Sequence, residues 1–336
     1  FPAAGTWTVV AGTATISNAN DPAATLTGLG TGSVTMRWTV NNGPCGTTSD
    51  DMVILNYDPT NLAANAGPDQ SICVPVAPNM VAMAASSIIF PAVGTWSLVS
   101  GSGTIVNPNS PTTQITNLPI GIHEFQWTVS NGPCPNGNTT DNVIIYVYDF
   151  GSPLADAGPD QSLCTTNGTT TMAGSSLTIP ATGAWTLVSG TGTIVSPNSP
   201  TTSVTGLTVG QNIFQWTVNN GPCSGITTDQ MSIFIYDPNN PAADAGQNQN
   251  FCTPLTSTTM QGSPVTFPAT GTWNLVSGTA TITNVNDPNT TVTGIAVGVV
   301  QLAWTVNNGV CPGAITTDLV TITLADGDAQ AADAGP

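Results

Sequence analysis

The sequence predicts an all-β protein built as a tandem array of small β-sandwich domains, each of about 89 residues. The first observation is a tryptophan after a Gly-Thr or Gly-Ala pair, which recurs at Trp7, Trp96, Trp185 and Trp273. The second is a tryptophan in the pattern W-T-V-x-N-G, which recurs with the same spacing at Trp38, Trp127, Trp216 and Trp304. The third is the alternation of apolar and polar residues around them, which is typical of strands with one buried face. We expect both tryptophans of each repeat to lie in its core.

The period divides the chain into five segments. We predict a partial immunoglobulin-like repeat at 1–61, three complete repeats at 62–153, 154–241 and 242–330, and the start of a further repeat at 331–336. Each repeat opens on the motif A-x-A-G, found at Ala64, Ala155, Ala243 and Ala332. Because both ends of the sequence fall out of phase with this motif, we expect the sequence to be a window on a longer array.

Short alternating segments account for most of one repeat. In the repeat at 62–153 they lie at 70–74, 79–87, 94–99, 104–106, 112–118, 123–129 and 143–147. About seven short strands, no helical period and a tryptophan in mid-domain are typical of an immunoglobulin-like β-sandwich. The Asn-Gly pairs that follow the second tryptophan, such as Asn131-Gly132, predict a hairpin turn.

The cysteines also follow the repeat. Each complete repeat has one early and one late cysteine, which accounts for six of the seven. We therefore predict one disulfide within each repeat and an oxidising, extracellular location. The predicted pairs are Cys73–Cys134, Cys164–Cys223 and Cys252–Cys311. Cys45 is expected to be unpaired, because its early partner would lie before residue 1. A metal site is a poor alternative, because the chain has no C-x-x-C motif.

Composition excludes several classes of partner. The 336 residues include 18 Asp and Glu but one Lys or Arg, Arg37, so the formal charge is −17. Such a chain lacks the cationic surface that binds nucleic acid or anionic membranes, so we expect neither as a partner. No apolar stretch reaches the length that crosses a membrane, and we predict no direct membrane insertion.

Two motifs carry a resemblance to a known class of repeat. The opening A-x-A-G-P-D-Q at 64–70 and 155–161 resembles the entry strand of PKD-like domains. The continuation G-T-W-x-L-V-S-G, then F-x-W-T-V-x-N-G-P-C, resembles the repeat of very large Bacteroidota surface proteins such as the SprB-type gliding-motility adhesins. The resemblance implies export by the type IX system and display as long surface filaments. The W-D-F-G-D-G motif of typical PKD domains is absent, so the resemblance is to a PKD-like or immunoglobulin-like relative.

Catalysis is not predicted. The chain has no Lys, and its one His and one Glu, His123 and Glu124, are neighbours on a strand and therefore point to opposite faces. We expect His123 to be a surface residue. Calcium is the one cofactor hypothesis, because aspartates gather where repeats meet, at Asp149, Asp156, Asp160, Asp237 and Asp244. The alternative is that aspartate simply favours turns beside proline.

These features predict a segment of an extracellular stalk or filament in a large repetitive surface adhesin, rather than an enzyme. Its expected partners are the neighbouring repeats of the same chain, with surface glycans or further copies of itself as candidates. Three alternatives stay open. The first is an accessory glycan-binding region of a secreted polysaccharide-degrading enzyme. The second is a binding module that holds glycans through exposed aromatic residues such as Tyr146 and Tyr148. The third is a fibre that assembles from copies of the chain.

Overall fold

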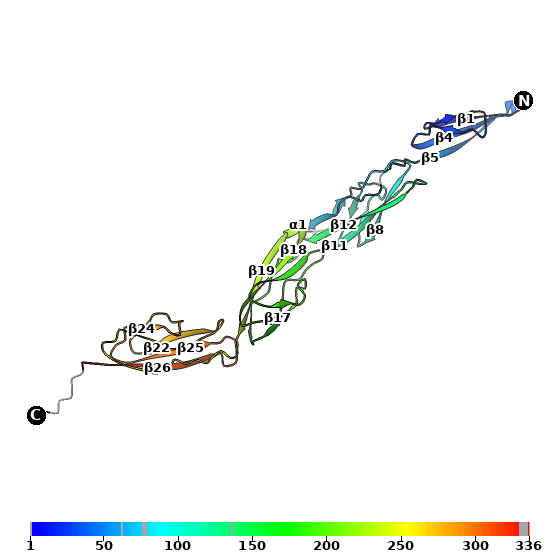
Figure 1. The fold of residues 1–336 in the computed structure, drawn as a ribbon. Coiled ribbons are helices and arrows are strands. Elements are labelled where there is room, and N and C mark those ends of the chain that lie inside the picture. Colours follow the sequence, from blue (N-terminus) through cyan, green and yellow to red (C-terminus); the bar gives the residue numbers. More distant parts are fainter. Residues whose placement is uncertain (1, 62, 76–78, 136, 329–334, 336) are drawn as a thin grey trace. The chain divides into compact units, whose positions relative to one another are not determined.

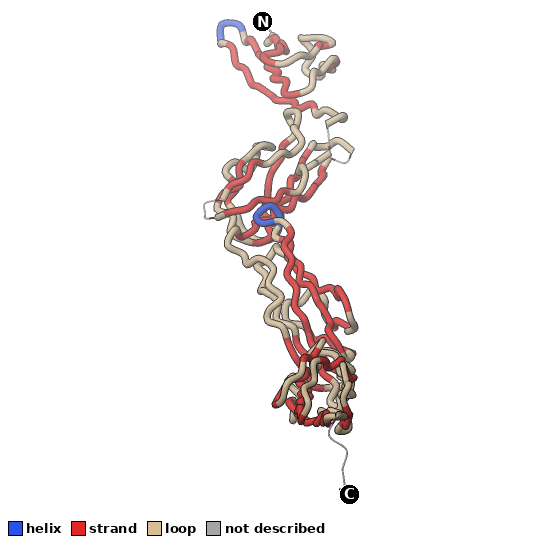
Figure 2. Tube along the Cα trace, turned by 90° about the vertical axis from the view of Figure 1, so that its left-hand side faces the viewer, coloured by secondary structure: helices blue, strands red, loops and turns tan. Residues whose placement is uncertain are grey.

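The computed structural model describes residues 2–61, 63–75, 79–135, 137–328 and 335, so the predicted segment 331–336 lies almost wholly outside it (Figure 1). The described chain forms strands β1 to β26 and two short helical turns, η1 (Gly43–Cys45) and α1 (Gly221–Ser224) (Figure 2). The prediction of an all-β protein is confirmed. The chain divides into two compact units.

The first unit contains residues 1–152, 178–181 and 220–225. Its first part forms the sheet β1-β4-β5 and the pair β2-β3. The bounds are β1 (Ala4–Ala11), β2 (Thr15–Ile16), β3 (Leu26–Thr27), β4 (Gly32–Asn41) and β5 (Thr47–Asn56). Its second part forms the sheets β6-β12-β11-β8 and β7-β10-β9. The bounds are β6 (Gln70–Val74), β7 (Met80–Ala82), β8 (Val93–Ser100), β9 (Thr104–Ile105), β10 (Gln114–Thr116), β11 (Gly121–Ser130) and β12 (Asn138–Asp149).

The second unit contains residues 153–177, 182–219 and 226–336 and shows the same arrangement twice. The sheets β13-β19-β18-β15 and β14-β17-β16 use β13 (Gln161–Cys164), β14 (Gly168–Thr171), β15 (Thr182–Ser189), β16 (Thr193–Ile194), β17 (Ser203–Leu207), β18 (Gly210–Asn219) and β19 (Ile226–Tyr236). The sheets β20-β26-β25-β22 and β21-β24-β23 use β20 (Gln249–Cys252), β21 (Ser257–Thr259), β22 (Thr270–Ser277), β23 (Thr281–Ile282), β24 (Thr291–Thr293), β25 (Gly298–Asn307) and β26 (Ile315–Ala325).

Each complete repeat is therefore a seven-stranded sandwich with a four-stranded and a three-stranded sheet. The first strand of the repeat pairs in parallel with the last, as β6 does with β12, whereas the other pairs are antiparallel. The compact units do not follow the repeats, because residues 178–181 and 220–225 of the third repeat belong to the first unit. The domain boundaries given above remain a prediction.

The core of each complete repeat is built around its two tryptophans. Trp96 lies opposite Trp127 on neighbouring strands, with ring centroids 5.1 Å apart, and both rings are buried. The pairs Trp185–Trp216 and Trp273–Trp304 have the same arrangement. The glycine of the Gly-Thr-Trp motif lies under the partner ring: a Cβ on Gly94 would lie 2.2 Å from the ring of Trp127. A larger residue would displace the tryptophan, which explains why glycine precedes it.

The first tryptophan pair is not buried as predicted. Trp7 and Trp38 stack at 5.0 Å like the others, but both are only half-buried. The described part of the first repeat contains no counterpart of β6 or β7, so its core lacks that cover. An apolar cavity of about 220 Å³ remains, lined by Trp7, Pro22, Ala24, Leu26, Met36 and Met52.

His123 is buried, which corrects the prediction of a surface histidine. Its side chain is 3% exposed and lies between two backbone groups. The Nδ1 atom accepts a hydrogen bond from the N–H of Ser102 at 3.0 Å, and Nε2 lies 2.9 Å from the carbonyl oxygen of Pro119. This arrangement requires the neutral tautomer with the proton on Nε2. Asn212 occupies the same position in the third repeat and bonds Thr191 and Thr208 in the same way.

Candidate functional site: the joints between successive repeats

Three joints between repeats are built from the same two segments. One is the linker that leaves the last strand of a repeat, beginning with Tyr-Asp; the other is the Asn-Gly loop of the next repeat. At each joint the loop asparagine donates a hydrogen bond from Nδ2 to the backbone carbonyl of the linker aspartate. The pairs are Asn131 to Asp58 at 2.8 Å, Asn220 to Asp149 at 3.0 Å and Asn308 to Asp237 at 2.9 Å. The first two joints lie within the first compact unit and the third within the second.

A tyrosine ring covers the loop glycine at each joint. Gly309 has φ +59°, and a Cβ there would lie 2.2 Å from the ring of Tyr236. The corresponding distances are 2.5 Å for both Gly132 with Tyr57 and Gly221 with Tyr148. The Asn-Gly pair, predicted only as a turn, therefore also allows the preceding repeat to approach. Nothing lies within 4 Å of the equivalent position at Gly43.

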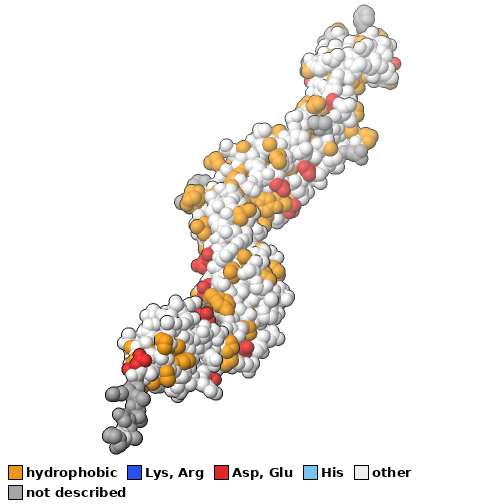
Figure 3. Space-filling view, turned by 60° about the vertical axis from the view of Figure 1, so that its left-hand side comes forward, with side chains coloured by type: hydrophobic (Ala, Val, Ile, Leu, Met, Phe, Trp, Pro, Cys, Tyr) orange, Lys and Arg blue, Asp and Glu red, His pale blue; other side chains and the backbone are white. Residues whose placement is uncertain are grey.

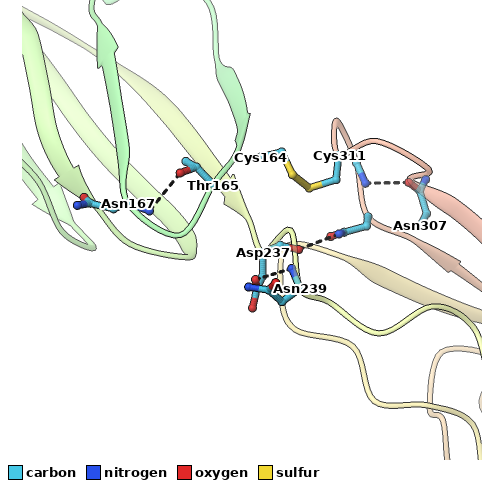
Figure 4. Close-up of a disulfide and its surroundings, with 9 residues drawn as sticks. Cys164, Thr165, Asn167, Asp237, Asn239, Asn307 and Cys311 are labelled. Carbon is cyan, nitrogen blue, oxygen red and sulfur yellow. Dashed lines mark hydrogen bonds between the residues drawn. A yellow bond between two sulfur atoms is a disulfide. The ribbon is translucent and has the colours of Figure 1, made fainter.

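The disulfides connect successive repeats, not the two cysteines of one repeat. Cys73 is bonded to Cys223, with Cα atoms 4.9 Å apart. Cys164 is bonded to Cys311, with Cα atoms 5.0 Å apart (Figure 4). This corrects the predicted pairs Cys73–Cys134, Cys164–Cys223 and Cys252–Cys311. Cys45, Cys134 and Cys252 have free thiols in the structure. In each bond, the early cysteine of one repeat meets the late cysteine of the next.

The parallel pairing of the first and last strands explains this result. Cys73 on β6 lies opposite Tyr148, near the end of β12, whereas Cys134 lies in the loop before β12 begins. At about 3.3 Å per residue, β12 separates these two positions by roughly 30 Å. A disulfide requires Cα atoms about 4.4–6.8 Å apart, so the pair within the repeat is excluded. The joint places Cys223 beside Cys73 instead.

Aromatic residues of a third segment, the loop before β8 or β22, also contact the preceding repeat at two joints. Phe267, in the loop before β22, packs against Phe234 on β19 with ring centroids 6.5 Å apart. In the first joint the equivalent Phe90 lies beside Gly32, where a Cβ would be 3.9 Å from the ring. Each joint thus combines hydrogen-bonded, aromatic and, in two cases, covalent contacts.

The aspartates predicted as calcium candidates bind backbone amides. Asp149, Asp156, Asp160, Asp237 and Asp244 accept hydrogen bonds of 2.8 Å from Gly151, Gly158, Ser232, Asn239 and Gly246 in turn. In other repeats Asn65 accepts the bond that Asp156 and Asp244 accept, and Asn248 accepts the bond that Asp160 accepts. These two positions therefore require an oxygen acceptor and not a charge. Within the described ranges, no three His, Cys, Asp or Glu side chains gather as a metal site would require. Four of the five bonds run to an amide two residues further on, as aspartate does in turns, whereas the Asp160 bond reaches Ser232 on β19.

Asp58 of the first linker and Arg37, the one cationic residue of the chain, each interact with a nearby residue. Hydrogen bonds from the hydroxyl and the N–H of Thr60 lower the pKa of Asp58. Arg37 forms a two-pronged ion pair with Asp51, with N–O distances of 2.7 and 2.9 Å. Figure 3 shows a face on which acidic side chains, some of them in small groups, lie among hydrophobic and other uncharged side chains.

The two aromatic residues suggested for glycan binding are both half-buried. Tyr148 lies against Gly221 of the next repeat. No described helix is long and apolar enough to span a membrane.

No family model matches the chain. Mouse dyslexia-associated protein KIAA0319-like protein is 26% identical over 209 residues, which cover 58% of this chain and 20% of that protein. The chain thus spans about a fifth of the length of this relative. Among solved structures, three immunoglobulin domains of titin, in an E-to-A mutated variant, cover 77% of this chain and 96% of theirs, with 14% identity and a TM-score of 0.34. The PKD domain of the KIAA 1837 protein covers 27% of this chain and 92% of its own, with 24% identity and a TM-score of 0.23.

Proposed function

We propose that this chain is a segment of an extracellular stalk in a large repetitive surface adhesin. The observation that carries the proposal is the repeated joint, in which a tyrosine–glycine contact and an asparagine–carbonyl bond connect one repeat to the next, with a disulfide at two of the three joints. A structural element that spans distance requires such connections at every step, whereas an isolated binding domain does not. The two disulfides support placement in an oxidising, extracellular compartment.

A finer version of the proposal is a bacterial adhesin of the gliding-motility type, exported by the type IX system. Its support is the sequence resemblance of the repeat motifs to SprB-type adhesins. We propose no enzymatic role, because the only His is held between backbone groups in the core.

Small-angle scattering of the oxidised chain tests the stalk. Sandwich strands of eight to ten residues rise about 3.3 Å per residue, so each domain of a stalk would add roughly 30–40 Å. A chain of this length folded into one globule would have a radius of gyration of about 20 Å. The proposal requires a maximum dimension above about 100 Å on the same per-domain rise. A radius of gyration near the globular value would refute it.

Peptide mapping without reduction provides the companion test of the joint. It should recover peptides linking Cys73 to Cys223 and Cys164 to Cys311. Linked peptides from within one repeat would remove the observation on which the proposal rests, even if the particle proved long.

Self-association is a second candidate, favoured by a repeated apolar pair on an edge strand. Leu98 and Val99 on β8 are 43% and 49% exposed, and the equivalent pairs on β15 and β22 are similarly exposed. An exposed apolar edge strand is a template for pairing with another chain. Sedimentation velocity over a hundredfold concentration range should then show association, and a constant monomer would exclude this candidate.

A further inference from the structure

The loop asparagine of every joint has one buried atom without a partner. The Nδ2 group of Asn131, Asn220 and Asn308 donates to the linker carbonyl, which fixes the orientation of the amide. The Oδ1 atom of all three therefore points away from that carbonyl, and it is buried with no hydrogen-bond donor among the described residues. These side chains are only 8%, 1% and 8% exposed. A buried acceptor left unsatisfied destabilises the fold, so the same loss at three equivalent positions calls for an explanation.

The linker supplies a second group of this kind. Four residues after the joint tyrosine, the Nδ2 atom of Asn61 and the Oγ atom of Ser152 are also buried without a partner. In the third joint the Nδ2 group of the equivalent Asn240 makes a 3.4 Å contact to the carbonyl of Pro241, while its Oδ1 atom accepts a hydrogen bond from the N–H of Thr266 at 2.9 Å. The first two joints therefore each contain an unsatisfied acceptor on the loop and an unsatisfied donor on the linker.

Two cavities bring these groups together. In the first joint, Asn61 and Asn131 line one cavity of about 200 Å³, with the hydroxyl-bearing Thr139. In the third joint, Asn240 and Asn308 line a cavity of about 190 Å³, with Thr316 at the equivalent position. One water needs about 10–15 Å³ of such space, so each cavity has room for several.

We infer that the first and third joints bind ordered water that bridges the loop asparagine to the linker. A water molecule donates to the Asn131 Oδ1 atom and accepts from the Asn61 Nδ2 group, two atoms that make no direct bond to each other in this structure. A cation fits the same cavities poorly. It requires oxygen ligands throughout, whereas the Asn61 Nδ2 group is a donor, and no carboxylate lines either cavity.

A crystal structure of the whole oxidised chain at high resolution is the first test. The expected result is a density peak 2.7–3.2 Å from Oδ1 of Asn131 and of Asn308, with at least one further neutral polar neighbour. Empty cavities, or a direct bond between the linker and loop side chains, would overturn the inference. A peak with six or more oxygen neighbours at 2.3–2.6 Å that disappears with a chelator would identify a cation and would also overturn it.

A solution measurement supplies a matched control. Water-selective nuclear Overhauser spectra should show long-lived water at the Nδ2 protons of Asn131 and Asn308. The control is Asn42, which occupies the same loop position in the first repeat but is exposed. Signals at Asn131 and Asn308 that are no stronger than those at Asn42 would mean that the joints hold no ordered water.

Discussion

Substituting Gly309 by alanine tests whether the tyrosine contact holds a joint together. The residue has φ +59°, so any side chain there carries a backbone cost of about 1–2 kcal/mol. The new Cβ would also lie 2.2 Å from the Tyr236 ring and must displace it, which adds about 1–3 kcal/mol of overpacking. The matched control is Gly43→Ala, where φ is +57° and nothing lies within 4 Å. The control should show the backbone cost alone.

Amide hydrogen exchange is the assay, because the backbone cost in the loop and the displacement of the tyrosine ring affect different N–H groups. The N–H of Asn308 and of Asn42 report on the two loops, since they bond Ala314 and Gly46. The Nδ2 group of Asn308 donates to the carbonyl of Asp237 across the joint, so its protons report on the joint. Gly309→Ala should accelerate exchange at these protons by roughly five- to hundredfold, because 1.4 kcal/mol corresponds to a factor of ten.

A double-mutant cycle sets the condition for refutation. In a Tyr236→Ala background the extra cost of Gly309→Ala over Gly43→Ala should vanish, because no ring remains to be displaced. If Gly309→Ala costs no more than its control in the native background, the tyrosine contact does not stabilise the joint.

Three further outcomes are expected. His123→Asn should leave the melting temperature of the second repeat almost unchanged, because asparagine makes the same bonds in the third repeat, whereas His123→Ala should cost about 1–3 kcal/mol. Trp216→Ala should cost about 3–5 kcal/mol by calorimetry, and a change below about 1 kcal/mol would show that its ring is not part of the core. The hydrogen bond from Arg37 lowers the pKa of Asp51 below 3.8, so the stabilising effect of the pair is present above that pH and is lost as the pH falls through the folded pKa. A carbonyl NMR titration of Asp51 should show this lowered midpoint, and Arg37→Gln should raise it.

Much of the fold could be predicted because the period and the alternation are direct consequences of strand geometry. The alternation at Phe125, Trp127 and Val129 places one face in the core, and all three side chains are buried. The same alternation places His123 on the buried face, two residues before Phe125. The surface assignment was wrong because it relied on the usual behaviour of histidine rather than on its position in the strand.

The disulfide partners could not be predicted from spacing alone. Cys73 precedes both Cys134 and Cys223, and these two differ only by one repeat, so the period fits either pairing. Closing the shorter loop is entropically easier, which favours the pair within the repeat. The parallel pairing of β6 with β12 decides otherwise, because it places Cys73 at the far end of the domain from Cys134. That pairing depends on the order of strands in the sheet, which a single sequence does not give.

The disulfide pattern also determines what a single cut does to the chain. The loop closed by Cys73–Cys223 overlaps the loop closed by Cys164–Cys311. A break in any one peptide bond between Cys73 and Cys311 therefore leaves the two fragments covalently attached. Disulfides within single repeats would leave the linkers unprotected, although exposed linkers are where proteases cut most readily. The overlapping pattern keeps the chain continuous after a nick, so damage to one linker does not release what lies beyond it.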